Sequence, residues 1–250
     1  MHLPFCYTGY ILTKEKYITL KYDNTILLGH FGGIAISGDY CFVASDKMVY
    51  RFLYTDISNT QSGESVTVID CFKPGNGADF ILTYNNQLIV GEFYLEKKYE
   101  TNEAHHIELF NGEKNYALAY IYNINQNKEF GIESTTPIAA LSLPKKVQGM
   151  NITSDGKIIL STSYSLPKSE LFIYENVFNE TTDITLTIQN NNIPVYILDE
   201  TALIKSISAP AMSEELASVD GQIYVLFESN CAKYRIFNRE RISNVYKLDI

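Results

Sequence analysis

Four polar side chains stand near the starts of four predicted hairpins, and their types could bind or transform a ligand. They are an imidazole, two carboxyl groups and an amide: His30, Asp79, Glu214 and Gln148. Carboxylate and amide oxygens are ligands that Ca²⁺ prefers, and a carboxylate can also act as a general base. If the hairpins surround one axis, we predict a ligand site at its mouth, where a divalent cation such as Ca²⁺ would be held by Asp79 and Glu214. The alternative is that these groups only satisfy strand ends around a wet channel.

A second polar set ends the second strand of three hairpins. Glu92, Ser163 and Glu228 lie where these second strands end, far from the hairpin turns, and would line the same mouth. We therefore include them in the predicted ligand site. A carboxylate that ends a buried strand also anchors neighbouring loops through backbone N–H groups, because an unpaired buried charge is costly. The sequence leaves both roles open for Glu92 and Glu228.

Other chemistry-bearing residues give no specific signature. His105 and His106 are adjacent, so on a strand they would point to opposite faces and only one could join a given site. No GxGxxG, GxSxG or HExxH motif occurs. The four cysteines show no CxxC or Cys-His spacing, which argues against a structural zinc site; they are Cys6, Cys41, Cys71 and Cys231. Whether the protein is an enzyme stays open.

The elements that must position these groups repeat along the chain. Four segments combine an apolar arm, a two-residue turn and a second apolar arm: 31–45, 78–94, 146–165 and 213–229. Their turns use residue types that tolerate the positive φ of tight hairpins; they are Gly38-Asp39, Asn85-Asn86, Asp155-Gly156 and Asp220-Gly221. Successive turns are 47, 70 and 65 residues apart. Such spacing fits units of four short strands, as in a β-propeller.

The stretches between the hairpins supply outer strands. We expect these in KMVYRFL, YALAYIYNI, IAALSL, ELFIYEN, ITLTIQ, VYILD and AKYRIF. The 19 Tyr and 13 Phe favour strands, and long helices are hard to place. Residues 96–115 form a polar excursion, and residues 206–215 lead into the last hairpin. The sequence therefore predicts an all-β protein.

Four segments in order carry a family resemblance: HFGGIAISG, FILTYNNQLIVGEFY, KVQGMNITSDGKIILSTSYS and APAMSEELASVDGQIYVLFES. They resemble a group of uncharacterised bacterial five-bladed β-propeller-like proteins. The resemblance implies one β-propeller domain over residues 1–250, five-bladed-like with an incomplete N-terminal blade. The inner hairpin expected before Gly9 is missing, and YILTKEKYITL reads as outer strands of that blade. A four-unit propeller is the alternative.

The mouth residues are also distantly similar to gluconolactonase and regucalcin-like propellers. In those families an acidic residue before an inner strand helps to hold a divalent metal in the channel. Their Glu-Gly-Pro motif is absent from this chain, where Ser213, Glu214 and Glu215 stand at the nearest position. This resemblance implies a metal-dependent hydrolase or lactonase-like enzyme as the alternative function.

Composition excludes some partners. A net charge of −9 and a pI near 5.0 argue against nucleic acid, which needs a concentrated basic surface. No stretch approaches the roughly 18 apolar residues that membrane insertion needs. The N-terminus lacks the basic start and apolar stretch of a signal peptide. We expect a cytoplasmic protein, or a secreted or cell-surface one if an N-terminal segment is missing.

The leading hypothesis is a binding propeller that holds a small molecule or a protein over its axial mouth. Its specificity is not encoded in any motif, and no motif requires a cofactor. A repeat-built structural protein without a small ligand is a third reading. A missing inner hairpin would leave a sheet edge unpaired near residues 10–28, and unpaired edges promote dimerisation.

Overall fold

The computed structural model describes residues 7–10, 16–234 and 240–250 of the 250-residue chain. These residues form twenty-three β-strands, one six-residue α-helix and three short 3-10 turns. The predicted all-β fold is confirmed. No helix within the described ranges is long and apolar enough to cross a membrane.

Each of the four predicted hairpins starts a separate sheet, and each sheet is named for its first strand. The β4 sheet contains, in spatial order, β4 (Phe31–Ser37), β5 (Tyr40–Ser45), β6 (Met48–Leu53) and β8 (Asp70–Phe72). The β15 sheet contains β15 (Val147–Ile152), β16 (Ile158–Thr162), β17 (Ser169–Tyr174) and β20 (Leu203–Ala209). Both sheets are antiparallel throughout.

The other two sheets recruit strands from elsewhere in the chain. The β9 sheet runs β9 (Phe80–Tyr84), β10 (Gln87–Gly91), β13 (Ala117–Asn123), β14 (Ala139–Leu143), β19 (Asn191–Ile197) and β18 (Thr185–Ile188). The β21 sheet runs β21 (Ser213–Val219), β22 (Gln222–Phe227), β23 (Val245–Leu248) and β1 (Tyr7–Tyr10). The first strand of the chain is therefore the outermost strand of a sheet built from the last three.

The turns explain why these segments reverse direction. Asn85 and Asn86 have φ of 46° and 59°, and Asp220 and Gly221 have φ of 50° and 73°. These values suit the tight turns that match the twist of paired strands. The third hairpin differs from the prediction, because its strands end at Ile152 and resume at Ile158. A five-residue loop closed by a hydrogen bond from the Thr153 N–H to the Lys157 carbonyl replaces the expected two-residue turn.

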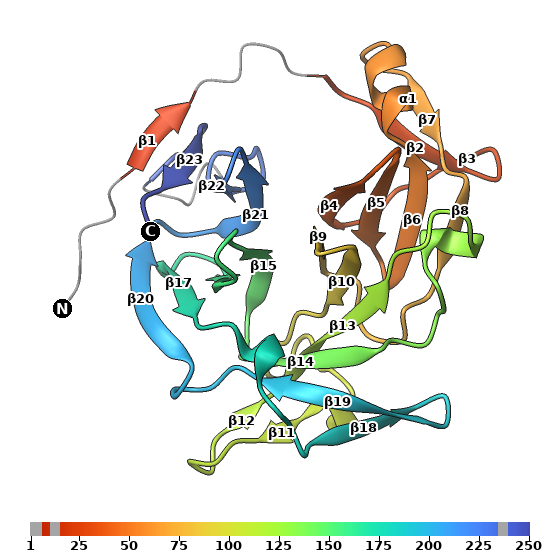
Figure 1. Ribbon diagram of the computed structural model, residues 1–250. Helices are drawn as coiled ribbons and strands as arrows, with labels where there is room; N and C mark the ends of the chain where they lie inside the picture. The colour runs from red at the N-terminus through yellow and green to blue at the C-terminus, as the bar shows by residue number, and fades with distance from the viewer. Residues whose placement is uncertain (1–6, 11–15, 235–239) are drawn as a thin grey trace.

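The sheets stand around a common centre with β4, β9, β15 and β21 innermost (Figure 1). Because side chains alternate between the faces of a strand, each sheet contributes to the apolar layers on both sides. One layer lies between the β4 and β9 sheets, a second between the β9 and β15 sheets, and a third between the β15 and β21 sheets. Among the described residues, the β21 and β4 sheets share no such layer, and Figure 1 shows a gap between them.

A small sheet covers the outer part of the β4 sheet on the side of this gap. It has the order β3 (Thr25–Ile26), β2 (Thr19–Tyr22) and β7 (Ser65–Thr67). Its Leu20 and Val66 pack with Val68 against Cys41, Val43 and Phe52. The helix α1 (Tyr54–Asn59) precedes β7 in the chain. The polar excursion carries one 3-10 turn (Glu103–His105) and the short strands β11 (Ile107–Glu108) and β12 (Lys114–Asn115).

Three predicted segments differ from the structure, and one of them extends into residues that the structure does not describe. Residues 206–215 are no simple connection, since β20 occupies 203–209 as an outer strand. The described start of AKYRIF, residues 232–234, forms a turn, and 235–239 lie outside the described residues; β23 supplies the third strand of that sheet instead. YILTKEKYITL does not lie in one blade, because Tyr10 belongs to β1 and Thr19 to β2.

Three of the four cysteines lie within the described residues. Cys41, Cys71 and Cys231 are free thiols, while Cys6 lies outside the described residues. Cys41 is fully buried, and burial raises the pKa of its thiol to about 11. It therefore behaves as a small apolar side chain at neutral pH.

Candidate functional site

The starts of the four innermost strands meet at one end of the molecule. A Cβ added to Gly149 on β15 would lie 2.8 Å from the carbonyl oxygen of Glu214, and one added to Gly33 on β4 would collide with Oε2 of Glu215. Glycine at these two positions allows the strands to approach this closely. The predicted registers of β4, β15 and β21 therefore do face one another, and Glu215 lies between them.

Glu92, at the end of β10, is buried in the wall of this mouth. Its Oε1 accepts hydrogen bonds from Nδ1 of His105 at 2.7 Å and from the N–H of Leu118 at 2.9 Å. Its Oε2 accepts one from the N–H of Gly77 at 3.2 Å. The side chain is 3% exposed. Three donors thus hold this carboxylate, and the geometry supports the anchoring role for Glu92 over contact with a ligand.

His105 extends that network into the core. Its Nε2 lies 3.0 Å from the hydroxyl of Tyr120, and both side chains are buried. Burial raises the pKa of Tyr120, so the phenol stays protonated. His106 points elsewhere and contacts Thr101 through Nε2 at 3.1 Å. The two adjacent histidines therefore serve different neighbourhoods, although neither lies in a strand, because His105 ends a 3-10 turn and His106 caps it. His105 ties the polar excursion to the β9 sheet.

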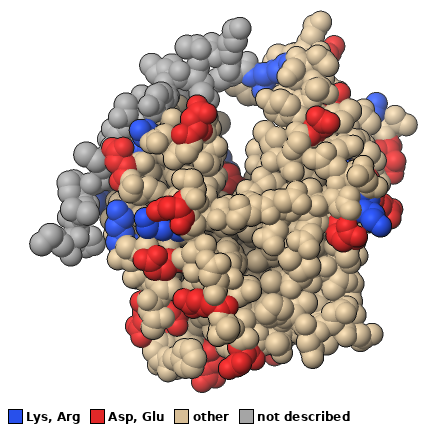
Figure 2. All heavy atoms as spheres, viewed as in Figure 1, with Lys and Arg blue, Asp and Glu red and all other residues tan. Residues whose placement is uncertain are grey.

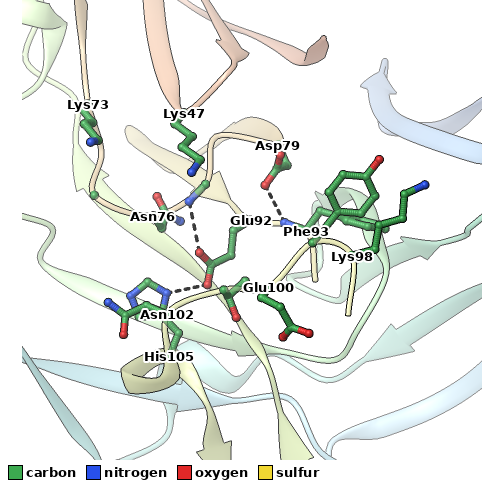
Figure 3. Close-up of a pocket in the computed structure, with 14 residues that line it drawn as sticks. Lys47, Lys73, Asn76, Asp79, Glu92, Phe93, Lys98, Glu100, Asn102 and His105 are labelled. Carbon is green, nitrogen blue, oxygen red and sulfur yellow. Dashed lines mark hydrogen bonds and ion pairs between the residues drawn. The ribbon is translucent and has the colours of Figure 1, made fainter. Parts of the chain in front are cut away.

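A cavity of about 450 Å³ opens beside this network (Figure 3). Its wall comes from the β5–β6 turn, the segment before β9, the end of β10 and the polar excursion. The polar side chains that line it are Lys47, Lys73, Asn76, Asp79, Glu92, Lys98, Glu100, Thr101, Asn102 and His105. Of the predicted site residues, this cavity contains Asp79 and Glu92.

Asp79 and Asn76 both line the cavity (Figure 3). Oδ2 of Asp79 accepts a hydrogen bond from the N–H of Phe93 at 2.8 Å. Burial raises the pKa of Asp79 above its usual range, and the Phe93 bond together with the charges of His30 and Lys47 opposes that rise. Nδ2 of Asn76 donates to the carbonyls of Val90 and Leu118. Asn76 therefore fixes the wall that carries Asp79.

Three lysines surround the cavity, although the chain as a whole is acidic. Lys47 and Lys73 lie on the side of Asn76, and Lys98 lies beside Phe93 (Figure 3). Within the described ranges, none of the three is within ion-pair distance of a carboxylate. Sequence reasoning missed these lysines because they lie far apart in the chain and match no motif.

An aromatic cluster flanks the cavity at Lys98. The rings of Phe93, Tyr99 and Tyr164 lie 5.6 to 6.5 Å apart, and the Lys98 ammonium lies 5.1 Å from the centres of both tyrosine rings. Lys98 also contacts the Tyr164 hydroxyl, which raises the pKa of Lys98. Cation–π contact of this kind orders the side chain. The cluster joins the β9 and β15 sheets at the mouth.

Glu214 and Glu215 contrast with Glu92, because both are half-buried and lack comparable donors among the described residues. Within that part of the chain, Oε2 of Glu215 is buried and has no hydrogen-bond partner, while its Oε1 accepts the N–H of the next residue, Leu216, at 3.2 Å. Burial raises the pKa of Glu215 well above its usual range. Burial, together with the charge of Glu228, raises the pKa of Glu214 to about 9. The carboxyl group of Glu214 is therefore protonated at neutral pH.

The remaining predicted residues lie around the same mouth with different degrees of exposure. His30 is exposed and close enough to Asp79 for its charge to act on that carboxyl. Gln148 is half-buried, with Nε2 at 3.5 Å from the carbonyl of Ser163, which is itself buried. Glu228 is half-buried and acts on Glu214. Among the described residues, no three His, Cys, Asp or Glu side chains converge as metal ligands, so the Asp79–Glu214 calcium site stays a prediction.

Comparison with known proteins adds little to this geometry. No protein-family model matches the chain, and no curated protein matches it. Among solved structures, the computationally designed Ika4 protein shares 7% identity over 87% of this chain and 94% of its own, with a TM-score of 0.38.

Two natural proteins give similar values. Hsv2 from Kluyvelomyces marxianus shares 11% identity over 82% of this chain and 66% of its own, with a TM-score of 0.34. BamB from Moraxella catarrhalis shares 8% identity over 90% of this chain and 83% of its own, with a TM-score of 0.25. Likeness at this level assigns no function to the chain.

Proposed function

We propose that this protein is a propeller-like binding protein that holds a small anionic molecule in the cavity at its mouth. The observation that carries the proposal is the placement of Lys47, Lys73 and Lys98 around one cavity of about 450 Å³, in a chain of net charge −9. Cationic groups without ion-pair partners attract an anionic ligand, and a concave site strengthens that attraction.

The wall of the cavity indicates what else the ligand carries. Asp79 and Glu100 supply acceptor oxygens beside the lysines. A hydroxyl or ammonium group on the ligand would donate to them, whereas a purely anionic ligand would be repelled. The aromatic cluster offers apolar ring surface at the same rim. A small carboxylate or phosphate with hydroxyl groups fits this combination, and cavities of this size suit such molecules.

The experiment is a thermal-shift titration with inorganic phosphate, gluconate and glucose 6-phosphate, with glucose as the uncharged control. We expect one of the hydroxylated anions to raise Tm and glucose to leave it unchanged, because a ligand that binds only the folded state stabilises it. Lys73→Ala weakens binding about fivefold or more, and Lys128→Ala, an exposed lysine outside the cavity, leaves it unchanged. No shift with any anion, or equal shifts in both variants, contradicts the proposal.

The calcium alternative is tested in the same titration. A hydrolase with a channel metal would need ionised Asp79 and Glu214, and a bound cation would lower the pKa of both carboxyl groups. Added Ca²⁺ or Mn²⁺ would then raise Tm in the wild type and lose that effect in Glu214→Gln. An unchanged Tm in the presence of these ions rejects the metal site and leaves the anion proposal standing.

A further inference from the structure

Two parallel strand pairs indicate the place of a further sheet that is only partly filled by the described residues. β19 pairs in parallel with β14, the fourth strand of the β9 sheet. In the chain, β19 lies between β17 and β20, the third and fourth strands of the β15 sheet. β7 pairs in parallel with β2, and β7 likewise lies between the third and fourth strands of the β4 sheet. β2 therefore takes the place of an outermost strand of a preceding sheet.

The inner part of that preceding sheet is missing from the described residues. Three strands, β13, β10 and β9, lie inside β14. Inside β2 there is only β3, which spans two residues. The gap between the β21 and β4 sheets in Figure 1 lies at this place, and Figure 2 shows it as a hollow in the surface.

Two sheet faces border the gap, and both expose apolar side chains. On β4, Ile34 and Ile36 are 50% and 49% exposed, opposite the buried Ala35. They share a face with their cross-strand partners Val43 and Cys41, which the β2 sheet covers. On the β21 sheet, Val219 and Leu226 are 53% and 47% exposed, on the face opposite the buried layer shared with the β15 sheet.

The rest of the molecule shows what covers such a face. The opposite face of the β4 sheet is covered by Ile81 of β9 and by Leu88 and Val90 of β10. The β15–β16 hairpin likewise fills the space between two sheets, because Met150 and Leu160 pack on one side and Ile159 on the other. The cover that fits the gap is therefore a two-stranded antiparallel hairpin that is apolar on both faces.

We propose that this gap is a docking site for a β-hairpin of a partner protein. The hairpin would lie between Ile36 and Leu226, and its outer strand would extend the β2 sheet by backbone hydrogen bonds, a known mode of β-strand addition. Exposed Asp220 directly follows the last residue of β21, and Figure 2 shows acidic side chains beside the hollow. A partner hairpin with lysine or arginine near the end that faces Asp220 complements this charge.

A dye-labelled synthetic peptide of residues 146–165 is the probe, because this hairpin is apolar on both faces and carries two lysines and one aspartate. Fluorescence anisotropy measures its binding to the full chain, with a scrambled peptide as control. We expect Ile36→Asp and Leu226→Asp to weaken binding about tenfold or more, since a carboxylate would be buried against apolar strands. The matched control is Leu166→Asp, at a 52% exposed leucine outside the gap, which leaves affinity within about twofold.

Each outcome decides the proposal. Weakening confined to the gap variants, with Tm close to that of the wild type, supports it. Absence of binding at millimolar peptide, or equal weakening by Leu166→Asp, overturns it. Sedimentation equilibrium tests whether a second copy of this chain fills the gap instead. A wild-type dimer that Ile36→Asp converts to a monomer would show this and would also overturn the proposal. Because Lys73 lines the lysine cavity and not the gap, Lys73→Ala leaves peptide affinity unchanged and separates this test from that of the anion site.

Discussion

Glu92 and Glu215 both lie at the mouth, and both have carboxyl oxygens out of contact with water. Glu92 follows β10 and is buried, whereas Glu215 lies on β21 and is half-buried with a buried Oε2. Glu92 accepts hydrogen bonds from a histidine and two backbone N–H groups. Glu215 has a buried oxygen with no partner, and its neighbour Glu214 also titrates far above its usual range. The comparison teaches that the available donors, and not burial alone, determine whether a buried carboxyl group stabilises the fold.

The largest expected effect is on the Glu92 side. Glu92→Gln replaces an oxygen acceptor by an amide that faces the existing donors, and breaking such a buried network costs about 3 kcal/mol in the free energy of unfolding. Urea denaturation at pH 7 measures this loss. Glu96→Gln, at an exposed position nearby, is the matched control. An equal effect of the two variants would mean that the network does not hold the β9 sheet and the excursion together.

Glu214→Gln is expected to raise the free energy of unfolding, whereas Glu92→Gln lowers it. Its pKa rises from 4.5 to about 9 on folding, so the unfolded chain releases a proton that the folded chain retains. The stability contributed by the protonated form is fully present below about pH 4.5 and is lost as the pH rises through about 9. Glu214→Gln therefore raises the free energy of unfolding by about 1–3 kcal/mol at pH 8 and changes it little at pH 4.

Urea denaturation at pH 4, 6 and 8 measures this difference. Glu215→Gln is expected to act in the same direction, because burial also raises the pKa of Glu215. A loss of stability in Glu214→Gln at pH 8 would show that the ionised carboxylate has a favourable partner. In that case Glu214 would stabilise the fold as Glu92 does, and the proposed difference between the two carboxyl groups would be wrong.

Asp79 lies between these extremes, because one oxygen accepts the Phe93 N–H while burial still raises its pKa. Asp79→Asn keeps an acceptor for that N–H, so we expect the free energy of unfolding to change by about 1 kcal/mol or less. Binding of the anion that gives the largest thermal shift should weaken about tenfold, since a hydroxyl donor loses a charged acceptor. Unchanged affinity would place the ligand away from Asp79.

The smallest effect is expected from Glu228→Gln. The charge of Glu228 is a secondary cause of the raised pKa of Glu214, so its removal lowers that pKa without relieving the burial. Carboxyl ¹³C NMR of Glu214 measures the change, with Glu170→Gln as a control on the outer side of the β15 sheet. A rise in the pKa of Glu214 would indicate that Glu228 donates to it as a protonated partner instead.

Local patterns were sufficient for the hairpins and for most outer strands. Asn85-Asn86 and Asp220-Gly221 favour the positive φ of tight turns, and the apolar arms beside them pair with each other. The strand β20 was missed because Ser206 and Ser208 alternate with small apolar residues and resemble a connection. Its pairing with β17 supplies the stabilisation that its local sequence does not indicate.

The candidate site could be predicted only in part. The repeat places Asp79, Gln148 and Glu214 at equal positions of equivalent hairpins, and their sharing of one ligand site stays a prediction. The lysines of the cavity could not be found in this way, because Lys47 belongs to a turn, Lys73 to a connection and Lys98 to an excursion. Such residues become neighbours only when the sheets pack.

The sequence by itself determined the all-β class, the four hairpins and the acidic character, because turn chemistry, alternation of side chains and net charge are local or additive properties. Packing of the sheets sets which carboxyl groups receive donors, which lysines share a cavity and where two apolar sheet faces are left uncovered by the described residues. These features depend on contacts between segments far apart in the chain, such as Glu92 with Leu118 and Gly33 with Glu215. No local pattern encodes such contacts, since their energy arises only after the sheets have packed.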